Sequence, residues 1–280
     1  MGIFGGSYTK PGKGISKEEA AKRNYFDILG RKFWQLVKLN LLYVLCNILF
    51  FGGSIFLAIG YDWNAIFDAL LSGQLMLLPP LPFLPLMLTG PFTAGLTYVI
   101  RNYSRQEHAF LVSDFFEHSK KNLKQGLAMS VLQVLVLYLF VTAFFFYRQF
   151  FISQGWNFGL LLGITLILSV MLLTMSFYVY PIMVTFDMKL KHILRNSWIF
   201  AMSKLPQNLL ILLIIGAVHF LLLWYLPVVW LLLMVLILIS WSSYTMNYYV
   251  WHVMDKYMMS QIEDSNQQEE SVFDDDLITK

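Results

Sequence analysis

Long apolar runs alternate with short charged segments along this chain. A helix rises about 1.5 Å per residue, so about 20 apolar residues are enough to cross a hydrocarbon layer of roughly 30 Å. Residues 205–254 contain no Asp, Glu, Lys or Arg and are long enough for two crossings, with Pro227 marking the turn. The pattern predicts an all-α polytopic membrane protein with six transmembrane helices. The predicted spans cover about residues 36–60, 80–100, 126–147, 158–186, 208–226 and 228–254.

Two charged segments between the spans combine basic residues with an apolar helical stripe. They follow the second and fourth spans, and we call residues 101–124 the first elbow and residues 187–207 the second elbow. In the first elbow, Asp114 followed three places later by Glu117 is typical of a capping box and predicts a helix that begins at Asp114. Amphipathic helices of this kind lie flat in the lipid headgroup layer. The candidate partner or lipid surface consists of Asp114, Glu117, Lys120, Lys121, Lys124, Lys189, Lys191 and Arg195.

The basic residues set the predicted orientation. The chain has 20 Lys and Arg residues, and all of them except Arg148 lie before residue 39, in the two elbows or after residue 254. Short cytoplasmic loops collect Lys and Arg, so we expect a multi-pass plasma-membrane protein with cytoplasmic termini and two cytoplasmic elbow helices. Residues 1–35 form a basic cytoplasmic leader with an interfacial helix. Residues 255–280 form an acidic tail with too little apolar surface to fold alone.

The composition indicates lipid rather than water as the main solvent and offers little chemistry. Hydrophobic residues make up 58% of the 280 residues and charged residues 13%, which does not suit a water-facing surface. The single cysteine, Cys46, cannot form an intramolecular disulfide or a cysteine metal cluster, and the five histidines include no i, i+4 pair. The spans contain no carboxylate, which argues against an ion-coupled pump. We therefore expect no enzymatic activity, no cofactor, no metal site and no nucleic-acid partner.

Polar and hinge residues inside the spans leave two interpretations open. Gly90-Pro91 falls near the middle of the second span and predicts a bend there. In the first interpretation, Thr93 and its neighbouring threonines bond to carbonyl groups of their own helix, and the amides Asn47 and Gln133 bridge helices. In the second, the same residues line a polar path or a ligand pocket. The candidate intramembrane set is Asn47, Gly90, Pro91, Thr93 and Gln133.

Several short segments resemble those of a known family. Residues 30–34, 38–43 and 90–96, and residues 114–116 followed by 122–125, are similar to the YesL-like family of bacterial membrane proteins, a family of unknown function. The resemblance covers about residues 1–225. It implies a cellular context, because YesL-like proteins tend to be encoded beside carbohydrate uptake systems and polysaccharide-degrading enzymes. It implies no catalytic or binding residue.

Two hypotheses for the function follow. The first is an accessory or regulatory component of carbohydrate uptake, whose partners are anionic lipid headgroups on the cytoplasmic face and components of a carbohydrate transporter. The alternative is a permease or pore that moves a neutral solute through its own transmembrane bundle. The sequence leaves the substrate, the partner, the oligomeric state and the role of the acidic tail open.

Overall fold

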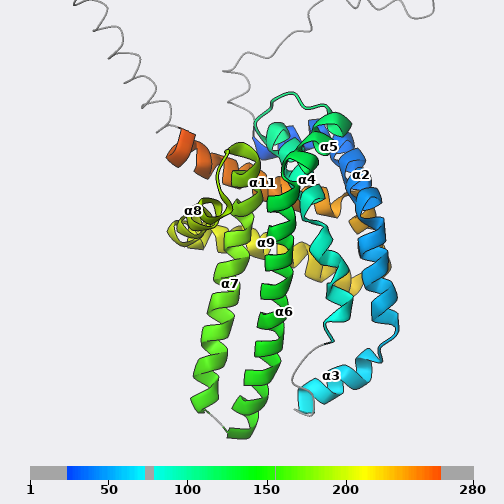
Figure 1. Cartoon of the computed structure of the whole chain (residues 1–280), viewed down its shortest axis with the longest axis vertical. Coiled ribbons are helices and arrows are strands. Elements are labelled where there is room, and N and C mark those ends of the chain that lie inside the picture. Colours follow the sequence, from blue (N-terminus) through cyan, green and yellow to red (C-terminus); the bar gives the residue numbers. More distant parts are fainter. Residues whose placement is uncertain (1–23, 73–78, 155, 260–280) are drawn as a thin grey trace, which may run out of the picture.

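The computed structural model describes residues 24–72, 79–154 and 156–259, and all regular elements within these ranges are helices (Figure 1). The all-α fold class is therefore confirmed for the described residues. In chain order the elements are α2 (Tyr25–Ile59), α3 (Trp63–Ser72), η1 (Leu81–Phe83), η2 (Pro85–Leu88), α4 (Gly90–Ser104), α5 (Leu111–Lys121), α6 (Leu123–Gln154), α7 (Trp156–Thr185), α8 (Leu190–Ser203), α9 (Leu205–Tyr225), α10 (Pro227–Leu233), η3 (Met234–Leu238), α11 (Ile239–Met254) and η4 (Asp255–Met259). The first two η elements are 3-10 helices and the last two are π-helices.

Five helical stretches are long and apolar enough to cross a membrane: α2, α6, α7, α9 and the stretch from α10 into η4. A sixth results when Leu81–Leu88 and Gly90–Ser104, which meet at a bend of 48°, are counted as one span. The predicted bend at Gly90-Pro91 is confirmed. Pro91 stands in the first turn of α4, where its missing N–H needs no helical partner. The chain thus has the five to six apolar helices of a multi-pass membrane protein.

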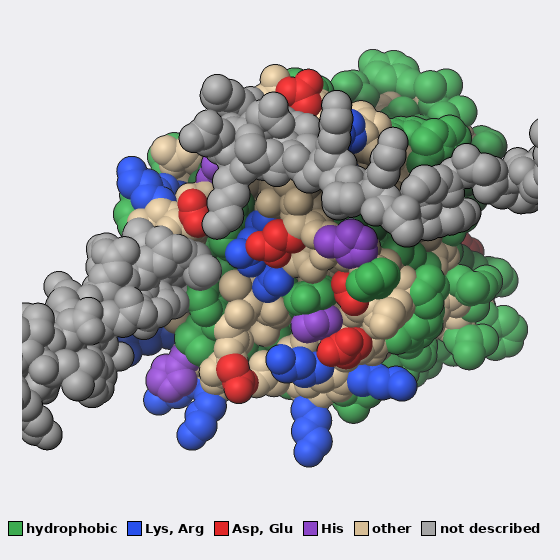
Figure 2. Space-filling view, turned by 90° about the horizontal axis from the view of Figure 1, so that it is seen from above, with side chains coloured by type: hydrophobic (Ala, Val, Ile, Leu, Met, Phe, Trp, Pro, Cys, Tyr) green, Lys and Arg blue, Asp and Glu red, His purple; other side chains and the backbone are tan. Residues whose placement is uncertain are grey.

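The helices run in two main directions. In Figure 1, α2, α4, α6 and α7 follow the long axis of the molecule, whereas α9 and α11 run across them. α11 packs against α2, α4 and α7, as expected of a helix that crosses its neighbours. In Figure 1, α5 and the start of α2 lie at the top, and α8 lies lower and at the left, beside the upper part of α7; we call this upper part of the molecule the elbow end. The helix α3 and the far ends of α6 and α7 lie at the opposite end. Charged side chains gather on the elbow end (Figure 2).

The first long helix begins at a complete capping box. The Asn24 side chain accepts a hydrogen bond from the backbone N–H of Asp27, and the Asp27 carboxylate accepts one from the backbone N–H of Asn24. These two bonds satisfy N–H groups that a helix start leaves without partners. From there α2 continues for 35 residues to Ile59. The second half of the predicted interfacial helix and the first predicted span therefore form one continuous helix.

Three glycines allow α4 to touch its neighbours backbone to backbone. A Cβ atom on Gly90 would overlap the backbone of Gly126 in α6, and one on Gly95 would overlap the backbone of Phe115 and the hydroxyl of Ser119 in α5. Small residues at helix contacts permit this close approach. The glycines around the bend therefore fix where α4 sits against α5 and α6.

The short helices α5 and α8 are anchored in the protein core. Phe115 of α5 is fully buried in an apolar cluster with residues of α2, α4 and α11, and Ile193 of α8 is fully buried in a second cluster with residues of α7 and α11. The apolar stripe predicted for the first elbow is therefore only partly available to lipid, since Phe116 and Leu123 are exposed and Phe115 is not.

One predicted helix boundary is wrong. The helix in the first elbow begins at Leu111 and not at Asp114, because the Asp114 carboxylate accepts a hydrogen bond from the backbone N–H of Phe110, at 2.9 Å. Asp114 therefore caps the helix from inside its first turn. At the other end of the molecule, α6 extends to Gln154 and α7 begins at Trp156, so both helices continue beyond the bounds of the third and fourth predicted spans.

Candidate functional site

The two elbows meet at the elbow end, although they are far apart in the sequence. The Gln125 side-chain amide, in the first turn of α6, donates a hydrogen bond to the backbone carbonyl of Met188, at 3.0 Å. Met188 stands just before Lys189, the N-cap residue of α8. This contact brings the end of the first elbow beside the start of the second.

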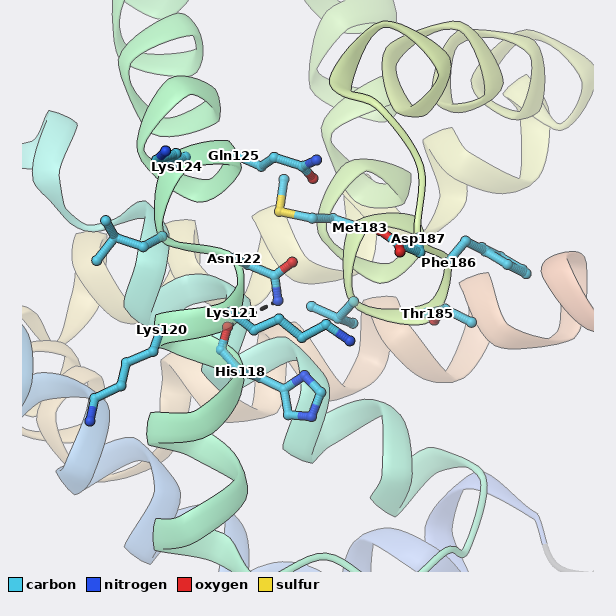
Figure 3. A pocket seen from close by; sticks show the side chains of 12 residues that line it. His118, Lys120, Lys121, Asn122, Lys124, Gln125, Met183, Thr185, Phe186 and Asp187 are labelled. Atoms are coloured by element: carbon cyan, nitrogen blue, oxygen red, sulfur yellow. Dashed lines mark hydrogen bonds between the residues drawn. The ribbon is translucent and has the colours of Figure 1, made fainter.

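A cleft of about 540 Å³ lies along this contact (Figure 3). We call it the elbow cleft. One wall is the junction of α5 and α6, and the other is the end of α7 with the chain that follows it. Its lining residues are His118, Lys120, Lys121, Asn122, Leu123, Lys124, Gln125, Met183, Val184, Thr185, Phe186 and Asp187.

The surroundings of the elbow cleft are strongly basic. The six predicted basic residues, which are Lys120, Lys121, Lys124, Lys189, Lys191 and Arg195, are all exposed. In Figure 3 the Lys121 side chain extends across the cleft toward Thr185, whereas the Lys120 and Lys124 side chains point away from it. Asp187 is the carboxylate in the lining. Among the predicted acidic residues, Asp114 caps α5 and Glu117 is exposed on the same helix.

The position of Lys189 and Lys191 is unusual for a helix. Lys189 is the N-cap residue of α8 and Lys191 lies in its first turn. The N-terminal end of a helix carries a partial positive charge, so cations there are unfavourable and anions are favourable. These two lysines do not stabilise α8, and together with the helix end they favour a bound anion.

His118 lines the cleft but does not add to the positive charge of the cleft at neutral pH. Its ring stacks on Tyr98 of α4, with the ring centroids 3.3 Å apart, and its Nδ1 atom is buried without a hydrogen-bond partner among the described residues. Burial lowers the pKa of His118, because it disfavours the charged form of the ring. The positive charge of the cleft at neutral pH therefore comes from its lysines.

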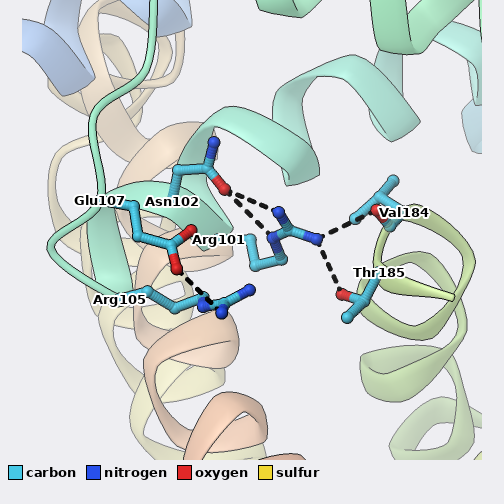
Figure 4. Close-up of polar contacts among 6 residues, drawn as sticks. All are labelled: Arg101, Asn102, Arg105, Glu107, Val184 and Thr185. Carbon is cyan, nitrogen blue, oxygen red and sulfur yellow. Dashed lines mark hydrogen bonds and ion pairs between the residues drawn. The ribbon is translucent and has the colours of Figure 1, made fainter.

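Arg101 holds one wall of the cleft in place (Figure 4). From the last turn of α4 its guanidinium donates hydrogen bonds to the backbone carbonyl of Val184 at 3.1 Å and to the Thr185 hydroxyl at 3.2 Å, both at the end of α7. Its remaining bonds go to the Asn102 side chain. The nearby carboxylate of Glu107 pairs with Arg105, at 2.8 Å. The end of α7 carries a partial negative charge and so compensates the Arg101 charge.

The predicted intramembrane residues do not form one site. Asn47 donates to the backbone carbonyl of Tyr43 in its own helix, and the Tyr43 hydroxyl lies 3.0 Å from that of Thr93. Thr93 also donates to the carbonyl of Thr89, as the first interpretation expects of threonines in spans. Gln133 lies elsewhere, on small apolar grooves between α6 and α7. Gly90 and Pro91 act in packing and bending, as described above.

Sequence reasoning missed the roles of Arg101 and Asn40. Arg101 counts in the sequence only as one more basic residue of an elbow. Asn40 is fully buried in α2; its amide nitrogen donates to the carbonyls of Met234 and Val235, and its oxygen accepts from the backbone N–H of Ser240. These groups lie in and beside the π-helix η3, whose wider turns leave backbone groups to be satisfied. The signal in the sequence was an amide near the start of an apolar span.

Comparison with known proteins finds one family model that matches part of the chain. A family model described as "Protein of unknown function, DUF624" matches residues 36–144. The matched range contains most of α2, all of α4 and α5 and most of α6, with the bend, the glycine contacts and one wall of the elbow cleft. No curated protein and no solved structure matches the chain. The resemblance found in the sequence is therefore confirmed over residues 36–144, which match the model of DUF624, an uncharacterised bacterial family that includes the YesL-like proteins.

Proposed function

We propose that this protein is an accessory or regulatory component of a carbohydrate uptake system in the plasma membrane, and that it holds a partner protein of that system at the elbow cleft. The cleft faces the cytoplasm in this proposal, with both termini on the same side. The observation that carries it is the hydrogen bond from Gln125 to Met188, which joins two basic segments into one surface. The protein acts by binding and catalyses no reaction of its own.

The positive charge at the cleft favours an acidic segment of the partner as the bound group. Three exposed lysines, Lys120, Lys121 and Lys124, line the cleft. Two more, Lys189 and Lys191, follow Met188 at the positive end of α8. Complementary charge of this kind steers a partner to its site and sets its orientation more than it adds affinity. Anionic lipid headgroups would interact with the same lysines at the membrane surface.

The rigidity of the cleft supports a specific partner and not only a charged surface. Arg101 ties α4 to the end of α7, and the glycine contacts hold α4 against α5 and α6. Both walls of the cleft are therefore fixed before a partner arrives. Preorganised surfaces bind more tightly because less conformational freedom is lost on binding.

Co-purification from detergent tests this proposal. The wild-type protein should recover a component of a carbohydrate transporter, and a variant with Lys120→Glu, Lys121→Glu and Lys124→Glu should recover about ten-fold less, since like charges across an interface repel. The matched control is Arg148→Glu at the opposite end, which should recover as much as the wild type. Recovery of no transporter component by the wild type, together with normal sugar uptake in a deletion strain, would overturn the proposal.

A further inference from the structure

The last described residues of the chain, those of η4, lie next to one end of α8. Tyr257 of η4 packs against Phe200, with the ring centroids 6.4 Å apart, and the Lys204 ammonium lies 4.9 Å from the Tyr257 ring centroid. Both contact residues belong to the last turn of α8 or follow it. The elbow cleft lies at the other end of the same helix, beside Met188 and Lys189.

The residues that follow are acidic. Seven carboxylates occur between residues 263 and 276, and after Lys256 the next basic residue is Lys280. The acidic residues are Glu263, Asp264, Glu269, Glu270, Asp274, Asp275 and Asp276. Their charge is opposite to that of the lysines that line the cleft, Lys120, Lys121 and Lys124, and of Lys189 at the start of α8.

The acidic residues lie at a suitable chain distance from the cleft. The helix α8 has 14 residues, so its two ends are about 20 Å apart. Residues 269–276 follow Met259 by 10 to 17 positions, and an extended chain reaches at most about 3.3–3.6 Å per residue, so the length of α8 is within their reach. A tethered segment reaches its highest effective concentration, on the order of millimolar, when its span matches the distance to the site.

We propose that the acidic segment 263–276 binds the elbow cleft of its own chain and so competes with the partner. This inference rests on the proposed function for the identity of the competitor, although binding of the segment can be measured without any partner. The contacts are between exposed charges, so the bound segment exchanges readily and is displaced by salt. The tail thus sets the concentration at which a partner is captured.

Zero-length crosslinking with a carbodiimide tests the binding directly. The probe is the full-length protein in an uncharged detergent, as an equal mixture of unlabelled and nitrogen-15-labelled chains. We expect amide bonds between carboxylates of residues 263–276 and Lys121, Lys189 or Lys191, and each bond should join two residues that carry the same isotope. These bonds should be about five-fold fewer at 1 M than at 0.05 M salt, because screening shortens the range of the attraction. If about half of the crosslinked pairs join chains of different isotope, as random contacts between chains would give, or if no crosslink forms to these lysines, the inference is overturned.

A second variant separates this inference from the proposed function. Replacing the five acidic residues at 269, 270, 274, 275 and 276 by Gln or Asn removes most of the segment's charge and leaves the described residues unchanged. The variant should capture about ten-fold more transporter component than the wild type at low salt, because it lacks the competitor. Equal capture by both proteins would overturn the inference and leave the proposed function standing. If neither protein captures a component but the crosslinks form, the proposed function fails and the tail contact stands.

Discussion

The two ends of the molecule are held together in different ways. At the elbow end, polar side chains connect different helices: Arg101 bonds to the end of α7, Gln125 to Met188, and the Tyr178 hydroxyl to Asn208 at 2.7 Å. In the half of α7 toward the opposite end, the hydroxyls of Thr165 and Ser169 bond to carbonyls of their own helix, and large apolar side chains such as those of Leu160 and Ile167 are exposed.

This difference indicates that the two ends of the molecule have different roles. Polar bonds between helices fix relative positions, whereas apolar side chains on the outside of a membrane helix face lipid that is as apolar as they are. The elbow end has the features of a preformed binding surface, and the opposite end has those of a membrane anchor. Equivalent substitutions at the two ends should therefore have unequal effects.

Glycine substitutions should show the largest difference. Gly90→Ala places a methyl group into the backbone of Gly126, so we expect a loss of about 3 kcal/mol of stability and little folded protein. The control is Gly163→Ala in α7, where a Cβ atom meets nothing within 4 Å; this change should leave stability equal or slightly higher. Thermal unfolding in detergent measures both. Similar unfolding temperatures for the two variants would contradict the close packing of α4 on α6.

Arginine substitutions should show the next largest difference. Arg101→Leu removes hydrogen bonds from a charged group to the end of α7 and leaves the Val184 carbonyl without its partner, which should cost about 2 kcal/mol. Arg148→Leu at the opposite end should cost less than about 0.5 kcal/mol. The same unfolding measurement compares them. If both variants unfold like the wild type, Arg101 does not hold the cleft wall.

Two glutamines on α6 give a finer comparison. Gln125→Leu removes the bond between the elbows, so we expect a loss of about 1 kcal/mol and a weaker capture of partner. Gln133→Leu should leave both stability and capture unchanged, because this side chain lines an apolar groove. Unfolding and co-purification test the pair. Weaker capture by the Gln133 variant alone would favour a role for the transmembrane bundle over the elbow cleft.

Acid should weaken the elbow end slightly through His118. Its pKa in the folded protein is lowered by burial, so the unfolded chain takes up a proton first as pH falls. The stability from the neutral ring is complete above the ordinary pKa of about 6.5 and is lost as pH falls below that value. His118→Gln should therefore flatten the fall in unfolding temperature between pH 7 and pH 5. An identical pH profile for wild type and variant would contradict the burial of the ring.

The sequence predicted the helices and the bend, because both depend on local properties. A run of apolar residues specifies a helix that can lie in lipid, and Pro91 specifies where the helical bonds are interrupted. It did not predict the start of α5, because the choice between Asp114 as a cap before the helix and as a cap within its first turn depends on the backbone path at Phe110. It also did not predict that α9 and α11 cross the other helices, since length gives no orientation.

The elbow cleft could be predicted only in part. Its basic residues stand out in the sequence as two separate elbows. Their meeting depends on Gln125 and Met188, which are 63 positions apart, and neither residue carries a local signal of that contact. The role of Arg101 could not be predicted for the same reason, because its hydrogen-bond partners are a backbone carbonyl and a hydroxyl on a helix that is distant in the sequence. Such tertiary contacts are fixed by packing and not by local pattern.

Photo-crosslinking in intact cells can identify what lies against the elbow cleft. A photoreactive amino acid replaces Lys121 in one strain and Arg148 in another, and the crosslinked proteins are identified by mass spectrometry. We expect a component of a carbohydrate transporter to be joined to position 121 and to be absent at position 148. The same component at position 148, or only lipid at position 121, would contradict the assignment of the elbow cleft as the partner site.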